Sequence, residues 1–239
     1  MGFEQFKEEM NKFLDIIKLT LNDEQIISFY KYMNLLIEKN KVMNLTAITD
    51  PEEIIIKHFM DSLTISKYLE DNSKIIDVGT GAGFPGIPVK MQNDTLEICL
   101  LDSLNKRINF LQEVINENKI NKIKAIHGRA EDFGQNREYR EKYNYAVSRA
   151  VAPLNILLEY MMPFVTIGGI CICMKGNIQA EEIEKGKNAA AILGGEIIKT
   201  ERFKLLDTEN ERAIILVKKT KQTPKIYPRN PGTPSKKPL

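Results

Sequence analysis

A glycine-rich turn follows an apolar segment in the first half of the chain. The segment 74–78, Lys-Ile-Ile-Asp-Val, leads into Gly79, Gly81, Gly83 and Gly86. Glycines allow positive φ angles and let a ligand approach the bare backbone. When such a turn joins a buried strand to a helix, it lies at the carboxyl edge of the sheet, where ligands bind. We therefore expect a cofactor site at this turn.

Two cofactor classes compete for this turn. Gly81-x-Gly83-x-x-Gly86 matches the dinucleotide fingerprint. Asp77, however, precedes the first glycine by two residues, and a carboxylate there repels a pyrophosphate but suits a cationic ligand without phosphate. S-adenosylmethionine is such a ligand, and Asp102, at the end of the next predicted strand, can accept both ribose hydroxyls. The pattern favours a class I methyltransferase over a dinucleotide-dependent oxidoreductase or a purely structural turn.

Residues after the later predicted strands face the same cleft. Ala130 and Glu131 follow the third strand, within reach of the adenine, although Glu131 or Asp132 can instead begin a short helix. Arg149 ends the fourth strand and faces the cleft, even if it pairs with a carboxylate. Phe84, inside the glycine turn, packs either against the methionine part of the cofactor or in the core.

Strands and helices alternate from residue 74 onward, which predicts a parallel sheet covered on both faces. The expected strands are 74–78, 96–102, 122–127, 143–148, 169–175, 195–206 and 211–218, and the helices between them are 86–91, 104–118, 153–161 and 177–193. The final hairpin is expected to add an antiparallel edge. The fold class is α/β: a Rossmann-like, mostly parallel seven-stranded sheet whose last strand is antiparallel, preceded by a helical extension.

Three regions are expected along the chain. Helical periodicity over residues 3–41, interrupted at 20–23, assigns 1–70 to the N-terminal helical extension. Residues 71–220 form the methyltransferase domain. Residues 221–239 form a basic, proline-rich tail holding five of the ten prolines, which predicts no helix and no central strand. The tail is either a linker-like extension or a strap over the surface.

Charge is distributed unevenly along the chain, which has 239 residues and a net charge of +2. Eight of the 34 basic residues follow Glu211, after which no acid occurs, so the rest has 26 basic against 32 acidic residues. A basic end on an acidic body indicates a polyanionic partner such as nucleic acid, or else a solvated tail. No apolar stretch approaches the ~20 residues of a membrane span. The three cysteines suit buried hydrophobes in a cytoplasmic protein without a metal site.

The sequence resembles the ribosomal small-subunit methyltransferase G family, also called the glucose-inhibited division protein B family, over nearly its whole length. The motifs that carry the resemblance are Asn44-Leu45-Thr46, His58-Phe59-x-Asp61, DVGTGAGFPGIP at 77–88, LLDSLNKR at 100–107, HGRAED at 127–132, SRAVAPL at 148–154 and GTPSKKPL at 232–239. It implies a bacterial enzyme that methylates N7 of a guanine in the 530 loop of 16S rRNA with S-adenosylmethionine. The cofactor contacts it implies are Gly79, Phe84, Ala130, Glu131 and Arg149, with Asp77, Gly81 and Asp102 as further pocket members.

Guanine N7 carries a lone pair and no proton, so its methylation needs alignment and exclusion of water rather than a general base. Arg149 is the catalytic candidate: it is expected to contact guanine O6, a phosphate or the cofactor carboxylate, and to leave N7 free. His58 is expected to be a buried structural imidazole. The candidate RNA-binding residues, each with a plain structural alternative, are Asn44, Lys175, Lys225, Arg229, Lys236 and Lys237. A nucleic-acid-binding protein with a vestigial cofactor fold is the alternative from another class.

Overall fold

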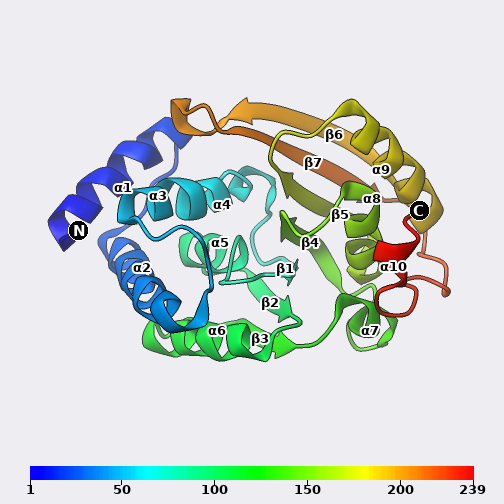
Figure 1. The fold of residues 1–239 in the computed structure, drawn as a ribbon, viewed down its shortest axis with the longest axis horizontal. Coiled ribbons are helices and arrows are strands. Elements are labelled where there is room, and N and C mark those ends of the chain that lie inside the picture. The colour runs from blue at the N-terminus through cyan, green and yellow to red at the C-terminus, as the bar shows by residue number, and fades with distance from the viewer.

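A single mixed sheet organises the chain, and the computed structural model describes residues 1–239 apart from the side chain of Asp207. Within this described part, seven strands follow the order β3-β2-β1-β4-β5-β7-β6 (Figure 1). They are β1 Lys74–Val78, β2 Glu97–Asp102, β3 Ile123–His127, β4 Tyr143–Arg149, β5 Val165–Lys175, β6 Gly195–Lys204 and β7 Glu211–Lys219. The predicted fold class and its antiparallel last strand are confirmed. The antiparallel strand itself does not form the edge, because β7 lies between β5 and β6.

Strand register brings the carboxyl ends of the central strands to one edge. Asp77 in β1 lies opposite Val147 in β4, and Arg149 at the end of β4 lies opposite Met174 in β5. Parallel pairing of β1 with β2 places Asp102 at the same edge. The residues that the sequence assigned to chemistry are therefore neighbours in space.

Helices cover both faces of the sheet, as Figure 1 shows. They are α1 Phe3–Ile17, α2 Asp23–Met43, α3 Pro51–Ile54, α4 Asp61–Leu63, α5 Gly86–Gln92, α6 Asn105–Glu117, α7 Ala130–Gln135, α8 Leu154–Met161, α9 Ala180–Leu193 and α10 Thr233–Lys236, with a π-helical turn, Ile55–Met60, between α3 and α4. Successive strand residues point to opposite faces. Ile75 thus packs in one core with α1, α2, α5 and α6, and Ile76 in a second core with α8 and α9.

Local sequence explains the helix boundaries of the N-terminal extension. Asn22 accepts the backbone N–H of Gln25 and forms a capping box at the start of α2, as expected for the break at 20–23. Asp50 accepts the N–H of Glu53 and caps α3. The Tyr32 hydroxyl, on α2, donates to the carbonyl of Ala82 in the glycine turn. The extension thereby shares a core with the sheet and supports the turn directly.

The tail lies as a strap across the surface near α7 and α8 (Figure 1). Arg140 donates to the carbonyls of Thr223 and Tyr227, and Gln135 donates to the carbonyl of Pro228. The expectation that the tail contains no helix is wrong for α10. Proline is compatible with a first helical turn, where its missing N–H would have no intrahelical partner.

The cysteines behave as small buried hydrophobes, as predicted. Cys99, Cys171 and Cys173 are free and buried, and burial raises the pKa of the Cys173 thiol to about 12. Among the described residues, no cluster of three or more His, Cys, Asp or Glu side chains is arranged to hold a metal ion. No helix in that same part of the chain is long and apolar enough to cross a membrane.

Candidate active site

The glycine turn follows β1 and is held in place by Asp77, the last residue but one of that strand. Gly79, Gly81 and Gly83 have φ angles of 70°, 63° and 105°, which other residues adopt only with strain. Asp77 Oδ2 accepts hydrogen bonds from Thr80 Oγ1 at 2.7 Å and from the Gly86 N–H at 2.8 Å. The carboxyl group therefore fixes both ends of the turn.

Asp77 lies beneath the turn rather than on a cavity wall. Its side chain is fully buried, and this burial raises its pKa to about 7, against the opposing effect of the hydrogen bonds from Thr80 and Gly86. The sequence argument that Asp77 presents a full negative charge to the ligand is therefore corrected. Asp77 Oδ2 accepts the first backbone N–H of α5, so the role of this residue is to stabilise the conformation of the turn.

Two adjoining cavities open above the carboxyl ends of β1, β2 and β4. They measure about 400 and 170 Å³ and share Gly79, Asp102, Ser103 and Val151. The larger cavity is also lined by Thr46, His58, Thr80, Gly81, Phe84, Arg107 and Arg149, and the smaller by Gly128, Ala130, Glu131 and Tyr160. Together they reach the size of small-molecule sites, roughly 300 to 1,000 Å³. The structure thus brings together every predicted cofactor residue except Asp77.

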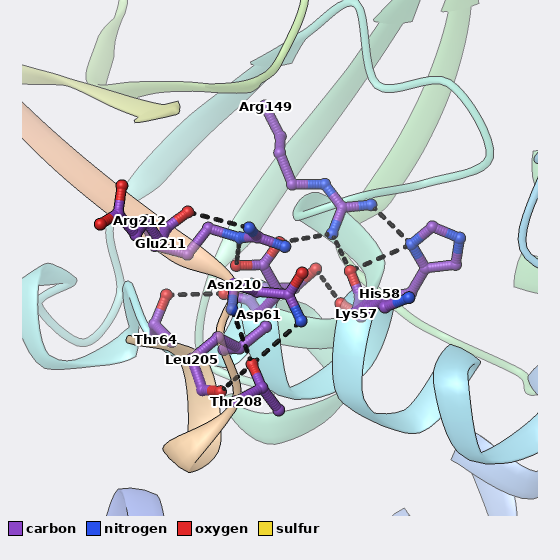
Figure 2. A network of polar contacts seen from close by, with 11 residues as sticks. Lys57, His58, Asp61, Thr64, Arg149, Leu205, Thr208, Asn210, Glu211 and Arg212 are labelled. Atoms are coloured by element: carbon purple, nitrogen blue, oxygen red, sulfur yellow. Dashed lines mark hydrogen bonds and ion pairs between the residues drawn. The ribbon is translucent and has the colours of Figure 1, made fainter. Parts of the chain in front are cut away.

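Arg149 is held by three neighbours at the back of the larger cavity (Figure 2). Its Nη1 donates to the Lys57 carbonyl at 2.8 Å and to Asp61 Oδ2 at 3.2 Å. Its Nη2 lies 3.0 Å from Nδ1 of His58. The side chain of Arg149 is only 15% exposed, so the guanidinium has a fixed orientation.

His58 is a buried and neutral member of this network. Burial, followed by the positive charge of Arg149, lowers the pKa of His58 to about 3. Arginine has no lone pair to offer, so His58 Nδ1 accepts from Arg149, and Nε2–H donates to Thr46 Oγ1 at 2.9 Å. The prediction that His58 is a buried imidazole is confirmed, and the imidazole lies in the cavity wall.

Phe84 lies between the core and the larger cavity. Its ring stacks on His58 at 4.4 Å and on Tyr32 at 5.5 Å between centroids. The Arg149 guanidinium lies 4.9 Å from the centre of the same ring. Phe84 therefore belongs to the core and also lines the larger cavity.

Asp102 lines both cavities, as a ribose-binding carboxylate should. Its Oδ2 accepts the Gly81 N–H at 2.9 Å, and its Oδ1 accepts the Leu104 N–H at 2.9 Å. Nη1 of Arg107 lies 3.2 Å from Oδ2 of the same carboxylate and forms an ion pair with it. A diol that binds Asp102 must therefore share or replace the contact with Arg107, which sequence reasoning did not anticipate.

Ala130 and Glu131 begin the short helix α7 and line the smaller cavity. Glu131 Oε1 accepts the N–H of Gly232 from the tail at 3.1 Å. The Tyr160 hydroxyl, in the same cavity wall, lies 3.0 Å from Ser235 Oγ. The tail thus supports this cavity from behind.

The candidate RNA-binding residues have different surroundings. Asn44 is exposed at the end of α2, next to the cavity residue Thr46. Lys175 Nζ instead contacts the Ala152 carbonyl at 2.7 Å and Glu182 Oε1 at 2.8 Å. Lys225, Lys236 and Lys237 are exposed. Arg229 pairs with the fully buried Glu159, so the structure gives Arg229 and Lys175 internal partners.

Some site residues were missed by the sequence argument. Asp61 was quoted only as part of a motif, yet it anchors Arg149. The contact of Thr46 with His58 was not anticipated either. The spacing of His58 and Asp61 could have indicated that both side chains reach the same partner, because residues three apart lie on one helix face. The distant partner of Asp61, Arg212 on β7, carried no such signal.

Comparison with known proteins gives concordant results. Residues 25–214 match the family model described as rRNA small subunit methyltransferase G. Proteins of that name from Alkaliphilus oremlandii and Acetivibrio thermocellus are 50% and 52% identical to this chain. The matches cover 93% and 92% of this chain and 94% and 91% of those relatives.

Solved structures support the fold at much lower sequence identity. A putative S-adenosylmethionine-dependent methyltransferase from Methanococcus maripaludis has a TM-score of 0.54 at 18% identity, over 80% of this chain and 93% of that one. TYW2 from M. jannaschii, in complex with AdoMet, has a TM-score of 0.55 at 15% identity, over 66% and 74% of the two chains. These likenesses show a shared fold.

Proposed function

Because this chain belongs to the rRNA small subunit methyltransferase G family, we propose that it transfers a methyl group from S-adenosylmethionine to N7 of a guanine in the 530 loop of bacterial 16S rRNA. The chain is an S-adenosylmethionine-dependent methyltransferase. The observation that carries the proposal is the pair of adjoining cavities, with Gly79, Asp102, Glu131 and Arg149 in their walls.

The residues present fit the cofactor. The positive φ angles at Gly79 and Gly81 favour glycine, and the missing side chains leave bare backbone in the cavity wall. Asp102 offers carboxylate oxygens to the ribose hydroxyls, and the entrance to α7 offers Ala130 and Glu131 to the adenine. When bound, S-adenosylmethionine supplies a sulfonium methyl group that a lone pair displaces in line.

The chain's own contribution to that displacement is alignment. Guanine N7 has no proton to lose, and the buried His58 has a pKa of about 3, with Nδ1 engaged by Arg149. His58 therefore holds Arg149 in place and does not act as a base. A wall made of Phe84, His58 and Arg149, whose side chains hold one another in place, orients the reactants, which can account for several kcal/mol of the barrier.

Arg149 has a limited number of donors left for ligands. A guanidinium has five N–H groups, and three of the Arg149 groups donate to Lys57, Asp61 and His58. The N–H on Nε and the second one on Nη2 remain without partners among the described residues. These two suit a carboxylate or guanine O6 and leave N7 free for methylation.

A dinucleotide-dependent oxidoreductase is disfavoured by the first turn of α5. Dinucleotide folds bind pyrophosphate on the N–H groups at this position. Here Asp77 Oδ2 accepts the Gly86 N–H from beneath the turn, so this N–H is already engaged and does not bind a phosphate. This supports a ligand without pyrophosphate.

On this proposal the enzyme works in the cytoplasm on 16S rRNA, either as free RNA, in a subunit precursor or in the finished small ribosomal subunit. The test is incubation of the purified protein with isotopically labelled S-adenosylmethionine and small subunits that lack the modification. We expect one labelled N7-methylguanine in the 530 loop, located by borohydride reduction and aniline cleavage. Subunits that already carry the modification are the control and should accept no label.

The result that would overturn the proposal is equally specific. Label on another base or another atom, or tight binding of a nicotinamide dinucleotide in place of S-adenosylmethionine by calorimetry, would exclude guanine-N7 methylation. Binding of RNA without any methyl transfer would favour the alternative of a nucleic-acid-binding protein.

A further inference from the structure

A second concave surface lies at the same edge of the sheet as the cofactor cavities. This groove, of about 440 Å³, is formed by the loop between β5 and α9, the end of β6 and the start of β7. It is lined by Gly176, Asn177, Ile178, Gln179, Arg202, Phe203, Lys204, Glu211, Arg212 and Ala213. It lies over the carboxyl end of β5, next to β4, whose end carries Arg149.

The groove carries an excess of positive charge. Arg202, Lys204 and Arg212 line it, against the single carboxylate of Glu211. Lys204 pairs at the surface with Glu209, whose side chain is 91% exposed. Such an exposed pair is weak and is readily exchanged for a stronger anion.

The two arginines are already held in place. Arg212 Nε donates to Asp61 Oδ1 at 3.0 Å, and its Nη1 donates to the Glu211 carbonyl at 3.0 Å. Arg202 Nη2 donates to the carbonyl of Ile178 at 3.2 Å. Each guanidinium keeps further N–H groups without partners among the described residues. Fixed guanidinium groups lose little entropy on binding a phosphate.

Asp61 joins the groove to the cofactor cavity. Its side chain, 5% exposed, accepts from Arg149 through Oδ2 and from Arg212 through Oδ1 (Figure 2). Arg149 and Arg212 thus lie on opposite sides of the Asp61 carboxylate, Arg149 in the larger cofactor cavity and Arg212 in the groove. The groove therefore adjoins the site, where the backbone that neighbours a base bound beside Arg149 can reach it.

On the basis of the proposed function, we propose that this groove binds backbone phosphate of the substrate RNA next to the target guanine. Arg202 and Lys204 supply the charge and Arg212 supplies an oriented contact. Their contribution is independent of sequence, because phosphates position a nucleic acid without identifying its bases.

The test is the double variant Arg202→Ala/Lys204→Ala, whose two positions lie outside the cofactor cavities. Filter retention measures its affinity for unmodified small subunits between 50 and about 300 mM salt. We expect the affinity to fall roughly tenfold at low salt and the slope of log affinity against log salt to flatten by about one per lost phosphate contact. Calorimetric affinity for S-adenosylmethionine should stay at the wild-type value, which also reports correct folding.

A matched control removes the same number of charges elsewhere. Lys185→Ala/Lys187→Ala lies on α9, where both lysines are exposed and pair with Glu181 and Glu184. We expect this control to keep the wild-type salt slope. The single charge reversal Lys204→Glu, at an exposed position, should weaken RNA binding more than Lys204→Ala.

The outcomes separate this inference from the proposed function. If both double variants bind subunits with the same affinity and salt slope as the wild type, the groove does not bind RNA and the inference is overturned. If wild-type protein transfers no methyl group, the proposed function fails, whatever the binding assay gives. Equal losses of affinity in both double variants would indicate that any loss of positive charge weakens binding, and would likewise overturn the inference that the groove binds RNA.

Discussion

Nη2 of Arg149 donates to Nδ1 of His58 across 3.0 Å, so the imidazole is an acceptor fixed beside a permanent cation. This contact joins the N-terminal extension to the end of β4. It assigns His58 to the architecture of the site rather than to proton transfer. It also has a consequence for stability that can be measured as a function of pH.

The low pKa of His58 predicts a loss of stability in acid. In the folded protein the pKa of His58 is about 3, lowered from 6.5, so below pH 6.5 the unfolded chain binds a proton that the folded chain does not. The free energy of unfolding should therefore fall by about 1.4 kcal/mol per pH unit between pH 6 and 4 on account of this residue. Denaturant unfolding of His58→Gln, which keeps an acceptor and a donor, should lack this component. Identical pH profiles for both proteins would contradict the assignment.

Asp77 predicts a pH dependence of the opposite sign. The pKa of Asp77 in the folded protein is raised from 3.8 to about 7. Between pH 4 and 7 the folded chain therefore keeps a proton that the unfolded chain has released, and the free energy of unfolding falls as the pH rises. Asp77→Asn mimics the protonated form and should become more stable relative to wild type by about 1.4 kcal/mol per pH unit over that interval. The measurement is the difference in unfolding free energy at pH 4.5, 5.5, 6.5 and 7.5. A constant difference would refute the raised pKa.

Arg149 should affect the reaction more than the fold. Arg149→Ala should lower the rate of methylation at least ~100-fold, as expected for a lost electrostatic contact in a preorganised site. Its stability should fall by only about 1–3 kcal/mol, because Asp61 keeps Arg212 as a partner. The comparison variant is Arg212→Ala, which also removes one partner of Asp61 but should retain calorimetric affinity for S-adenosylmethionine. Loss of that affinity in both variants would show that Asp61, and not Arg149, is the essential group.

Arg229 should stabilise the fold through Glu159. The fully buried Glu159 carboxylate accepts from the Arg229 backbone N–H at 2.9 Å, from Nε at 2.8 Å and from Nη2 at 2.5 Å. Arg229→Ala removes the guanidinium and leaves the buried carboxylate with only the backbone N–H of residue 229, which should cost about 3–5 kcal/mol. Thermal unfolding should show partial recovery in the double variant Arg229→Ala/Glu159→Gln. Lys225→Ala, at an exposed tail position, should change stability by less than ~0.5 kcal/mol.

Substitution of the exposed tail lysines tests whether the tail binds RNA phosphates, because it leaves the internal contacts of the tail in place. Deletion of the tail would also remove the contacts of Arg140 and Glu131, so it does not separate the two roles. The triple variant Lys225→Ala/Lys236→Ala/Lys237→Ala should keep wild-type stability and flatten the salt dependence of RNA binding by up to about three slope units. An unchanged slope would leave the tail a purely structural element.

Short-range signals in the sequence were sufficient for most of the secondary structure and for most of the predicted residues that line the two cavities. Apolar segments that alternate with helical segments identified the seven strands, and the interruption at 20–23 lies where Asn22 caps α2. Gly79, Gly81, Asp102 and Ala130 were identified because parallel strands bring their carboxyl ends to one edge. These features depend on periodicity and on turn chemistry, which are local properties of a chain.

Only the tertiary structure decided how charges are paired across the molecule. Asp61 and Arg212 are 151 positions apart, and Glu159 and Arg229 are 70 apart, so no periodicity relates them. Burial also changed the role of Asp77: its place at a strand end is visible in the sequence, but its protonation depends on the packing around it. Residue type and spacing therefore determined which groups meet at the sheet edge, while long-range packing determined which are charged, paired or free to bind a ligand.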